Sequence, residues 1–150
     1  MLRQQPKVSL RLFTFGQSVV EFAKKTYLSN KAKDFKGDRE FVSDVEARKA
    51  FSHFRACIGG LYWWRATHST SGTGRERMTT EADFAFRQAF AICPSNPEVI
   101  FRYTGLLMAN DRAAEAVIVA ETARSLDPGN PQFQQVLQQI NQARKTSSVK

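Results

Sequence analysis

In the C-terminal half of the chain, apolar residues recur every three or four positions in four successive segments. This spacing places them on one face of an α-helix. The segments run from Thr80 to Pro94 and then over 97–110, 112–126 and 131–144. The predicted inward residues are Ala82, Ala85, Phe86 and Ala89; Val99, Ile100, Tyr103, Leu106 and Leu107; Ala113, Ala116, Val117, Ala120, Ala123 and Leu126; and Phe133, Val136, Leu137 and Ile140.

Two more helices are predicted upstream. A short one spans Gln17 to Leu28, and a long one begins near Ser43, which forms a capping-box pair with Glu46, and ends near Ala66. The short helix presents Val19, Phe22, Ala23 and Thr26 on one side. In the long helix the predicted inward face is Ala47, Phe51, Phe54, Ile58, Leu61 and Tyr62, with Arg48, Lys49, Ser52 and Arg55 opposite.

Two pairs of residues in the long helix carry further expectations. Gly59 and Gly60 each cost about 1 kcal/mol relative to Ala in a helix, so we expect a neighbouring helix to approach closely there. Trp63 and Trp64 diverge by about 100° on a helix. Only one of them can therefore point inward, and the other could contribute to a binding patch.

Segment 81–131 repeats itself with a shift of 34 residues. EADFAFRQAFAICPSNP aligns with EAVIVAETARSLDPGNP, and six of the seventeen pairs are identical, where chance would supply about one. A period of this length is typical of stacked helix pairs, each of which needs its neighbour to bury its apolar face. Segment 131–144 then reads as a terminal capping helix, apolar on one side and rich in glutamine elsewhere.

This pattern resembles the tetratricopeptide repeat family. The small residues at helix crossings are Ala82, Ala89, Ala116 and Ala123, and the closing prolines are Pro94 and Pro128. The resemblance implies an all-α fold of antiparallel helix pairs in a short right-handed superhelix that serves protein–protein interaction. The chain departs from the family at Asp111, where Gly is usual, and at Ala120, where an aromatic residue is usual.

The first repeat unit is atypical. Its leading helix should occupy about 63–76, but most of that span is the polar run THSTSGTGRER. We therefore expect the long helix ending near Ala66 to take this role, with a loop insertion at 67–78. The predicted organisation is a basic arm at 1–15, a short helix and polar linker at 16–41, a helical domain at 42–144 and a disordered tail at 145–150.

A second resemblance involves the N-terminal part. FTFGQSVVEFAKKTYL, FVSDVEARKAF and GGLYWWRA are similar to the soluble C-terminal end of bacterial multi-pass membrane proteins related to protein O-mannosyltransferases. It implies an alternative function as the accessory tail of a membrane glycosyltransferase-like protein, with the catalytic part outside the chain.

Charge adds a second alternative. The net charge is +8, and residues 1–40 hold nine Lys or Arg against four Asp or Glu. Such an arm suits an anionic membrane surface or nucleic acid, although no RNP-type aromatics or recognition helix support nucleic acid. No apolar run reaches about 18 residues, the length of a membrane span, and the opening lacks the pattern of a signal peptide. We expect a soluble chain, cytoplasmic or attached to a membrane protein.

The predicted binding surface is the concave side of the stack, which the first helix of each pair lines. The uncommitted stripe of segment 97–110 includes Gly105, and the capping helix adds glutamines such as Gln132 and Gln142. The alternative is that Phe101 packs under the long helix and the glutamines only keep the end soluble. The predicted partner-binding residues are Glu98, Phe101, Arg102, Met108, Gln135 and Gln139.

Other candidate chemistry is weak. Cys57 and Cys93 have no metal-ligand spacing and are expected to be buried free thiols. His53 and His68 have no Ser, Cys or carboxylate partner that the sequence places beside them. The SGTG run at 71–74 lacks the Lys and strand context of a phosphate loop. We predict neither an enzyme nor a metal or cofactor site.

Overall fold

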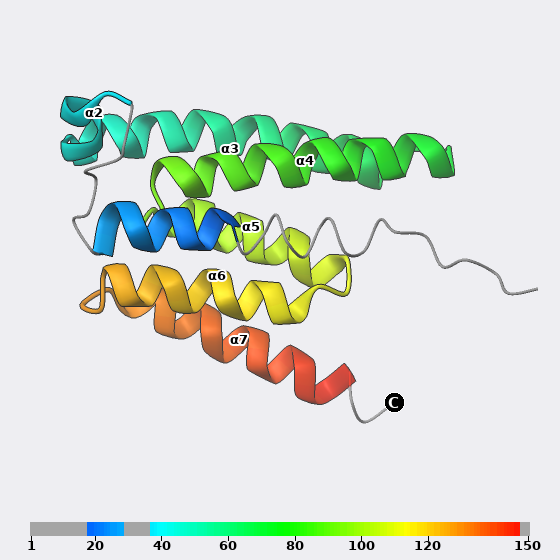
Figure 1. Cartoon of the computed structure of the whole chain (residues 1–150). Helices are drawn as coiled ribbons and strands as arrows, with labels where there is room; N and C mark the ends of the chain where they lie inside the picture. Colours follow the sequence, from blue (N-terminus) through cyan, green and yellow to red (C-terminus); the bar gives the residue numbers. More distant parts are fainter. Residues whose placement is uncertain (1–17, 29–36, 148–150) are drawn as a thin grey trace, which may run out of the picture.

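The computed structural model describes residues 18–28 and 37–147, and over this part the chain is helical and without strands (Figure 1). The predicted all-α class is confirmed. Residues 18–23 are α-helical and continue directly into a π-helical turn. The elements are η1 (Lys24–Leu28), α2 (Arg39–Ser43), α3 (Val45–Thr67), α4 (Gly72–Ile92), α5 (Pro97–Ala109), α6 (Ala113–Leu126) and α7 (Pro131–Ser147).

The helices form two stacked antiparallel pairs and a closing helix. α3 packs on α4, α5 packs on α6, and α7 packs on both α6 and α5. The first helices of the two pairs, α3 and α5, are also in contact. The stack therefore has the α3–α4 pair at one end and α7 at the other (Figure 1).

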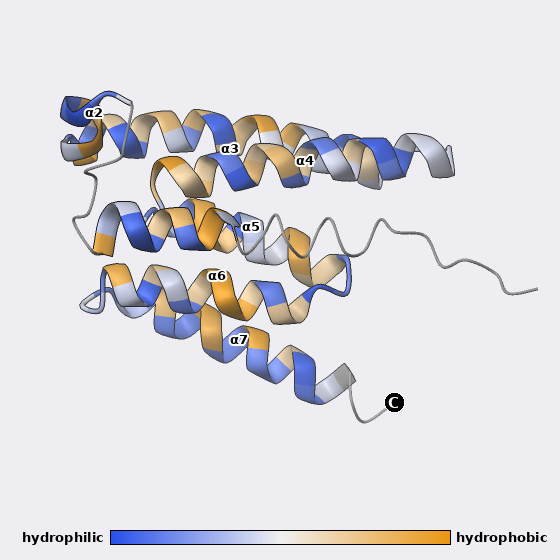
Figure 2. Ribbon diagram, in the orientation of Figure 1, coloured by the Kyte–Doolittle hydropathy of each residue, from blue (hydrophilic) through white to orange (hydrophobic). Residues whose placement is uncertain are grey.

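Alanines bring the helices of the core close together. Ala82, Ala89, Ala116 and Ala123, the four residues that the repeat alignment singles out, are all 0% exposed. Large side chains fill the space between them, and the rings of Phe86 and Tyr103 stack with centroids 6.1 Å apart. Apolar and polar stretches alternate along α5 to α7 in Figure 2, as amphipathic helices require. The predicted inward residues of α5 and α7 are all buried, which confirms their predicted faces.

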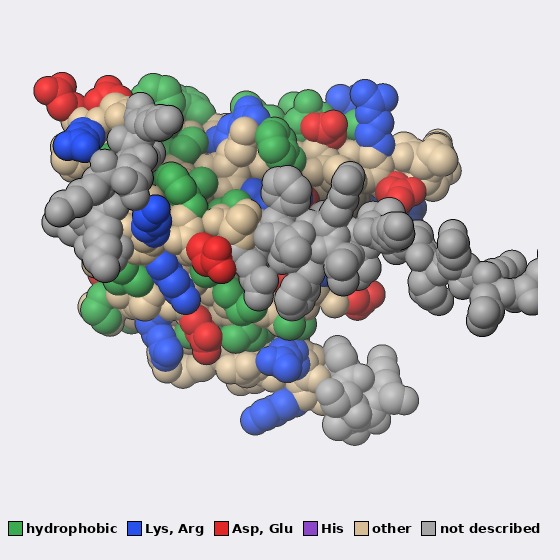
Figure 3. Space-filling view, viewed as in Figure 1, with side chains coloured by type: hydrophobic (Ala, Val, Ile, Leu, Met, Phe, Trp, Pro, Cys, Tyr) green, Lys and Arg blue, Asp and Glu red, His purple; other side chains and the backbone are tan. Residues whose placement is uncertain are grey.

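The predicted inward face of α3 is wrong. Phe51, Phe54, Ile58 and Leu61 are exposed, whereas Arg48 and Ser52 are buried. Small residues face the stack because α3 lies close to its neighbours, and the buried Ser52 hydroxyl accepts a hydrogen bond from Asn96 Nδ2 (2.8 Å). Arg48 is covered because its guanidinium stacks over the Tyr27 ring. Figure 3 shows hydrophobic side chains along the edge that α3 occupies.

The start of α3 also differs from the prediction. Ser43 is the last residue of α2, and the cap is Asp44, whose carboxylate accepts a hydrogen bond from the Ala47 N–H (2.9 Å). The segment at 16–41, predicted as a short helix and a polar linker, thus ends in a second short helix, which Asp38 caps. The predicted disordered tail at 145–150 is wrong over 145–147, because these residues continue α7. The basic arm at 1–15, residues 29–36 of the linker and the last residues of the tail lie outside the described residues.

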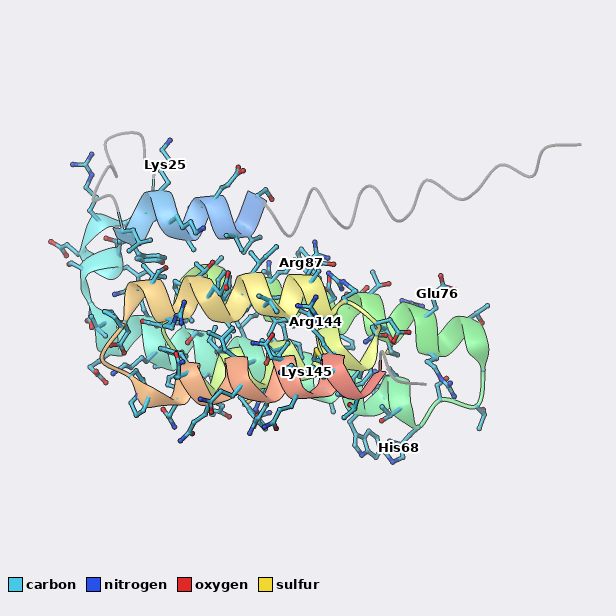
Figure 4. The ribbon with its side chains drawn as sticks, turned by 90° about the horizontal axis from the view of Figure 1, so that it is seen from below. Lys25, His68, Glu76, Arg87, Arg144 and Lys145 are labelled. Carbon is cyan, nitrogen blue, oxygen red and sulfur yellow. The ribbon has the colours of Figure 1, made fainter. Side chains whose placement is uncertain are left out.

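The predicted loop insertion at 67–78 is wrong as well. Only residues 68–71 separate α3 from α4, and Ser71 caps α4 by accepting a hydrogen bond from the Gly74 N–H (3.2 Å). The extra residues lengthen both helices, to 23 and 21 residues against 13 and 14 in α5 and α6. The end of the α3–α4 pair consequently projects beyond the other helices, near the labelled His68 and Glu76 in Figure 4.

Two local expectations for α3 are confirmed. A Cβ on Gly59 would lie 3.0 Å from Phe86 Cδ2, so α4 does approach closely at this position. The two tryptophans diverge, because Trp63 is half-buried against the core and Trp64 is 58% exposed and stacks on the His68 ring.

The turn between α5 and α6 explains one departure from the repeat family. Asp111 has a φ of 59°, in the left-handed region that favours Gly. The turn keeps the conformation for which a Gly is usually chosen, and the Arg112 N–H donates to the Leu107 carbonyl (2.9 Å). Aspartate tolerates this region better than most residues do, so the substitution is accommodated.

A buried charge network joins the two helix pairs. Arg112 Nη1 donates to Asp83 Oδ1 (2.7 Å), and its Nε and Nη2 donate to the Glu115 carboxylate at 2.7 Å each. Asp83, which is 2% exposed, also pairs with Arg87. Burial alone would lower the pKa of Arg112, but the hydrogen bonds that it donates to Glu115 and the charge of Asp83 raise it. Arg112 therefore stays charged.

The N-terminal helix lies against the stack on the side of α6 (Figure 1). Ala23 and Thr26 are buried as predicted, but Phe22 is 39% exposed and Val20 is buried in its place. The Tyr27 hydroxyl lies 3.0 Å from the Ala91 carbonyl oxygen and 2.9 Å from that of Ile92, at the end of α4. This helix therefore touches both helix pairs.

Candidate binding groove

One face of α5 remains open along the inner side of the stack, and it carries Phe101, which is 62% exposed. Two hollows flank this ring. The larger, of about 570 Å³, is lined by Gly60, Trp63, Phe86, Phe101, Arg102, Thr104, Gly105, Leu106, Met108, Val136, Gln139, Ile140 and Ala143. The smaller, of about 340 Å³, is lined by Pro97, Glu98, Phe101, Gln132, Gln135, Val136 and Gln139. We call the two hollows together the groove.

All six predicted site residues line this groove. Glu98 and Gln135 line the smaller hollow, Arg102 and Met108 line the larger one, and Phe101 and Gln139 line both. The alternative that Phe101 is packed under the long helix does not fit its exposure. The structure therefore brings the six residues together, while their role in binding a partner stays a prediction.

Sequence reasoning missed the contributions of α3 and the apolar floor from α7. Gly60 and Trp63 of α3 line the larger hollow, together with Val136 and Ile140 of α7. The three-residue spacing of Gly60 and Trp63 could have pointed to them. The larger apolar residues of α3 obscure this signal, because their hydrophobicity predicts that they, and not Gly60, face the interior.

The polar side of the groove is an ordered cluster around Glu98. One carboxylate oxygen is 2.8 Å from Arg102 Nη2, and the other is 2.7 Å from His53 Nδ1. His53 Nε2 lies 3.6 Å from the Cys57 thiol. The expectation that His53 lacks a partner is thus wrong, and so is the expectation that Cys57 is buried, because it is exposed. Cys93 is buried and free as predicted.

The order thiol, imidazole, carboxylate is that of a nucleophile with its base, but the surroundings do not fit acyl transfer. Cys57 lies within α3, where the main-chain N–H groups are committed to helix hydrogen bonds. Backbone donors aimed at a developing oxyanion, which acyl transfer needs, are therefore not available beside it. We interpret His53 as a residue that orders the groove rather than as a base.

The described residues contain no group of three or more His, Cys, Asp or Glu residues that could hold a metal ion. None of their helices is both long enough and apolar enough to cross a membrane.

Stacked antiparallel helix pairs with an open inner face define a helical repeat protein, in which each unit mainly contacts its neighbours. The particular repeat follows from comparison: residues 75–140, from α4 to α7, match the tetratricopeptide repeat family. This part of the chain therefore resembles tetratricopeptide repeats, which are protein–protein interaction modules and typically not enzymes.

No curated protein and no solved structure matches the chain. The similarity of its N-terminal part to O-mannosyltransferase-related membrane proteins gains no support from the comparisons. That similarity stays a prediction.

Proposed function

We propose that the chain is an interaction module that binds a short segment of a partner protein in the groove between α3, α5 and α7. The observation that carries this proposal is Phe101, a large aromatic side chain that stands 62% exposed between two hollows. Exposed aromatic residues beside pockets are the usual anchors of protein interfaces.

The chemistry of the groove indicates what such a segment contains. Trp63, Met108, Val136 and Ile140 give the larger hollow an apolar wall, which suits a bulky apolar side chain of the partner. A volume of about 570 Å³ accommodates more than one such side chain. The segment is therefore apolar at several positions, spaced either as in an extended strand or on one face of a helix.

The polar residues suit a main chain lying across the groove. The carboxamides of Gln135 and Gln139 offer both donors and acceptors. Arg102 and Glu98 form an ion pair, so the polar side of the groove is ordered in the unbound chain. Ordering in advance reduces the entropy lost on binding.

The test begins with peptides of about 15 residues, long enough to fill such a groove, selected from a random display library on the immobilised full chain. Affinity is then measured by fluorescence anisotropy for the wild type and for Phe101→Ala. We expect the substitution to weaken binding about tenfold or more, as for an interface anchor. Phe84→Ala is the matched control, because Phe84 is 50% exposed but lines neither hollow.

A second variant tests the polar side. Arg102→Glu places a like charge beside Glu98, and we expect it to weaken the selected peptides too. If Phe101→Ala and Arg102→Glu both bind the peptides as tightly as the wild type does, the assignment of the groove is wrong.

A further inference from the structure

A second exposed apolar surface lies on α3, outside the groove. Phe51 is 59% exposed, Phe54 67%, Ile58 40% and Leu61 59%, and none of the four lines either hollow. We call these four residues the outer α3 face. The hydrophobic side chains along the α3 edge of Figure 3 are on this side of the molecule.

The two ends of the stack differ in character. At one end, α7 buries Phe133, Val136 and Ile140 and turns glutamines outward, as a capping helix does. At the other end, α3 turns large aromatic and aliphatic side chains outward. A continuous row of this kind on a soluble repeat marks an interaction surface.

The spacing of the outer α3 face is symmetric. Its residues are separated by three, four and three positions, which is the spacing of a coiled-coil seam. Phe51 and Leu61 are each five residues from Ala56, and Phe54 and Ile58 are each two residues from it. When the helix is reversed about Ala56, the row coincides with itself.

We infer that two copies of this chain pair through α3, with the two helices antiparallel and a twofold axis level with Ala56. An interface with twofold symmetry uses the same patch on both copies, so the patch must complement its own reverse. In this pairing Phe51 lies opposite the partner's Leu61, and Phe54 lies opposite the partner's Ile58. Each aromatic ring therefore meets an aliphatic side chain.

The size of the patch is sufficient. With Trp64 on its flank, each copy offers five large apolar side chains that are 40–67% exposed. At about 100 Å² for each half-exposed side chain, the pair covers about 1,000 Å² in total, which is where specific interfaces begin. A reversible dimer is the result expected of such an area.

Charge modulates the pairing. Arg65 follows Leu61 at the next seam position, where it lies level with the partner's Ala47 and within reach of the partner's Glu46. The side chain of Glu46 is 84% exposed and so accessible to it. The net charge of +8 on each copy opposes association, and we expect added salt to favour the dimer by screening this repulsion.

The main experiment measures the mass of the full chain by light scattering, from low to high micromolar concentration and under reducing conditions. We expect the wild type to rise towards twice its 17.0 kDa, and Phe54→Glu to stay monomeric. Phe101→Glu is the matched control, because Phe101 is exposed to a similar extent but faces the groove, and it should still dimerise. A monomeric wild type at every concentration, or a Phe54→Glu variant that dimerises, would overturn the inference.

Cys57 provides an independent test of the geometry. It flanks the outer α3 face one residue from Ala56, so both copies of Cys57 lie on the same side of the seam, while Cys93 is 0% exposed. A short bismaleimide should cross-link wild-type dimers, and Cys57→Ser should abolish the cross-link without changing the dimer mass. A dimer that Cys57 does not cross-link would contradict pairing through α3. The inference would also be overturned if Phe54→Glu unfolded the chain, because an exposed residue of the seam can be replaced without loss of the fold.

Discussion

Gly59 sets how closely α3 and α4 pack. Its missing side chain leaves room for the Phe86 ring, which a Cβ would approach to 3.0 Å. Gly60 differs, because a Cβ there would meet only the end of the flexible Arg102 side chain. Gly105 differs again, since a Cβ there would meet nothing within 4 Å. Three helical glycines thus have three different surroundings.

Replacing each of these glycines by alanine should separate the cost of overpacking from the gain in helix propensity. At Gly59 the overpacking cost of about 1–3 kcal/mol exceeds the gain of about 1 kcal/mol in helix propensity, so stability falls. At Gly105 only the gain remains, and stability rises. Urea unfolding followed by circular dichroism measures both variants, with Gly60→Ala expected between them. Equal stabilities for the three variants would contradict close packing at Gly59.

Tyr103 is a buried phenol whose ionisation is coupled to folding. Burial, and then the charge of Asp83, raise the pKa of Tyr103 well above its ordinary value of 10.0. A pKa that is raised in the folded state means that the contribution of Tyr103 to stability is complete below pH 10.0 and is lost as the pH rises above it.

The free energy of unfolding should therefore fall as the pH rises above about 10. The free energy of unfolding of Tyr103→Phe should fall less steeply over the same range. Both chains retain Tyr27, whose pKa is also raised by burial, so it affects them equally. Urea titrations at several pH values provide the measurement. Parallel curves for the two chains would show that Tyr103 ionises freely in the folded state.

At the scale of elements, the link between the two helix pairs depends on Asp83. It lies on α4 and holds Arg112 at the start of α6 and Arg87 on its own helix. Removing one member of a buried charge network leaves the others without compensation.

Asp83→Asn should therefore lower the free energy of unfolding by about 3 kcal/mol. Thermal unfolding followed by circular dichroism measures it. Glu76→Gln is the control, because Glu76 is an exposed carboxylate of the same helix at its projecting end. Equal losses for the two variants would mean that the network contributes no more than a surface charge does.

The helices also show which parts of this fold a sequence can predict. α5 and α7 each have one apolar stripe and start at a proline, so their faces and starts follow directly. α3 has two stripes at helical spacing, a large one through Phe54 and Leu61 and a small one through Ser52, Ala56 and Gly59. Hydrophobicity favours burying the first, but close packing requires the second. The α5 side of the groove therefore follows from hydrophobicity, whereas the α3 side follows only from the spacing of its small residues.

At the scale of the whole molecule, α3 serves two surfaces. Gly60 and Trp63 face the groove, whereas Phe54 and Leu61 face away from the stack. Because the two sets lie on different sides of one rigid helix, a dimer would leave both grooves open. One pair of chains could then hold two partner segments at once.

Binding and pairing should accordingly be independent. Phe54→Glu should leave the affinity for groove peptides unchanged, Phe101→Glu should leave the dimer unchanged, and the double variant should show both losses in full. Anisotropy and light scattering on the same four chains provide the measurement. A weaker peptide affinity in Phe54→Glu would show that the two surfaces communicate.

The N-terminal helix has a mechanical consequence. It touches α6, and the Tyr27 hydroxyl donates hydrogen bonds to the last carbonyls of α4. The N-terminal helix therefore links the two helix pairs. Helical repeat proteins bend when one unit rotates against the next. Such a rotation here would strain the contacts of the N-terminal helix with α4 and α6. We therefore expect the N-terminal helix to keep the spacing of the two pairs constant, so that the proposed groove has a fixed width.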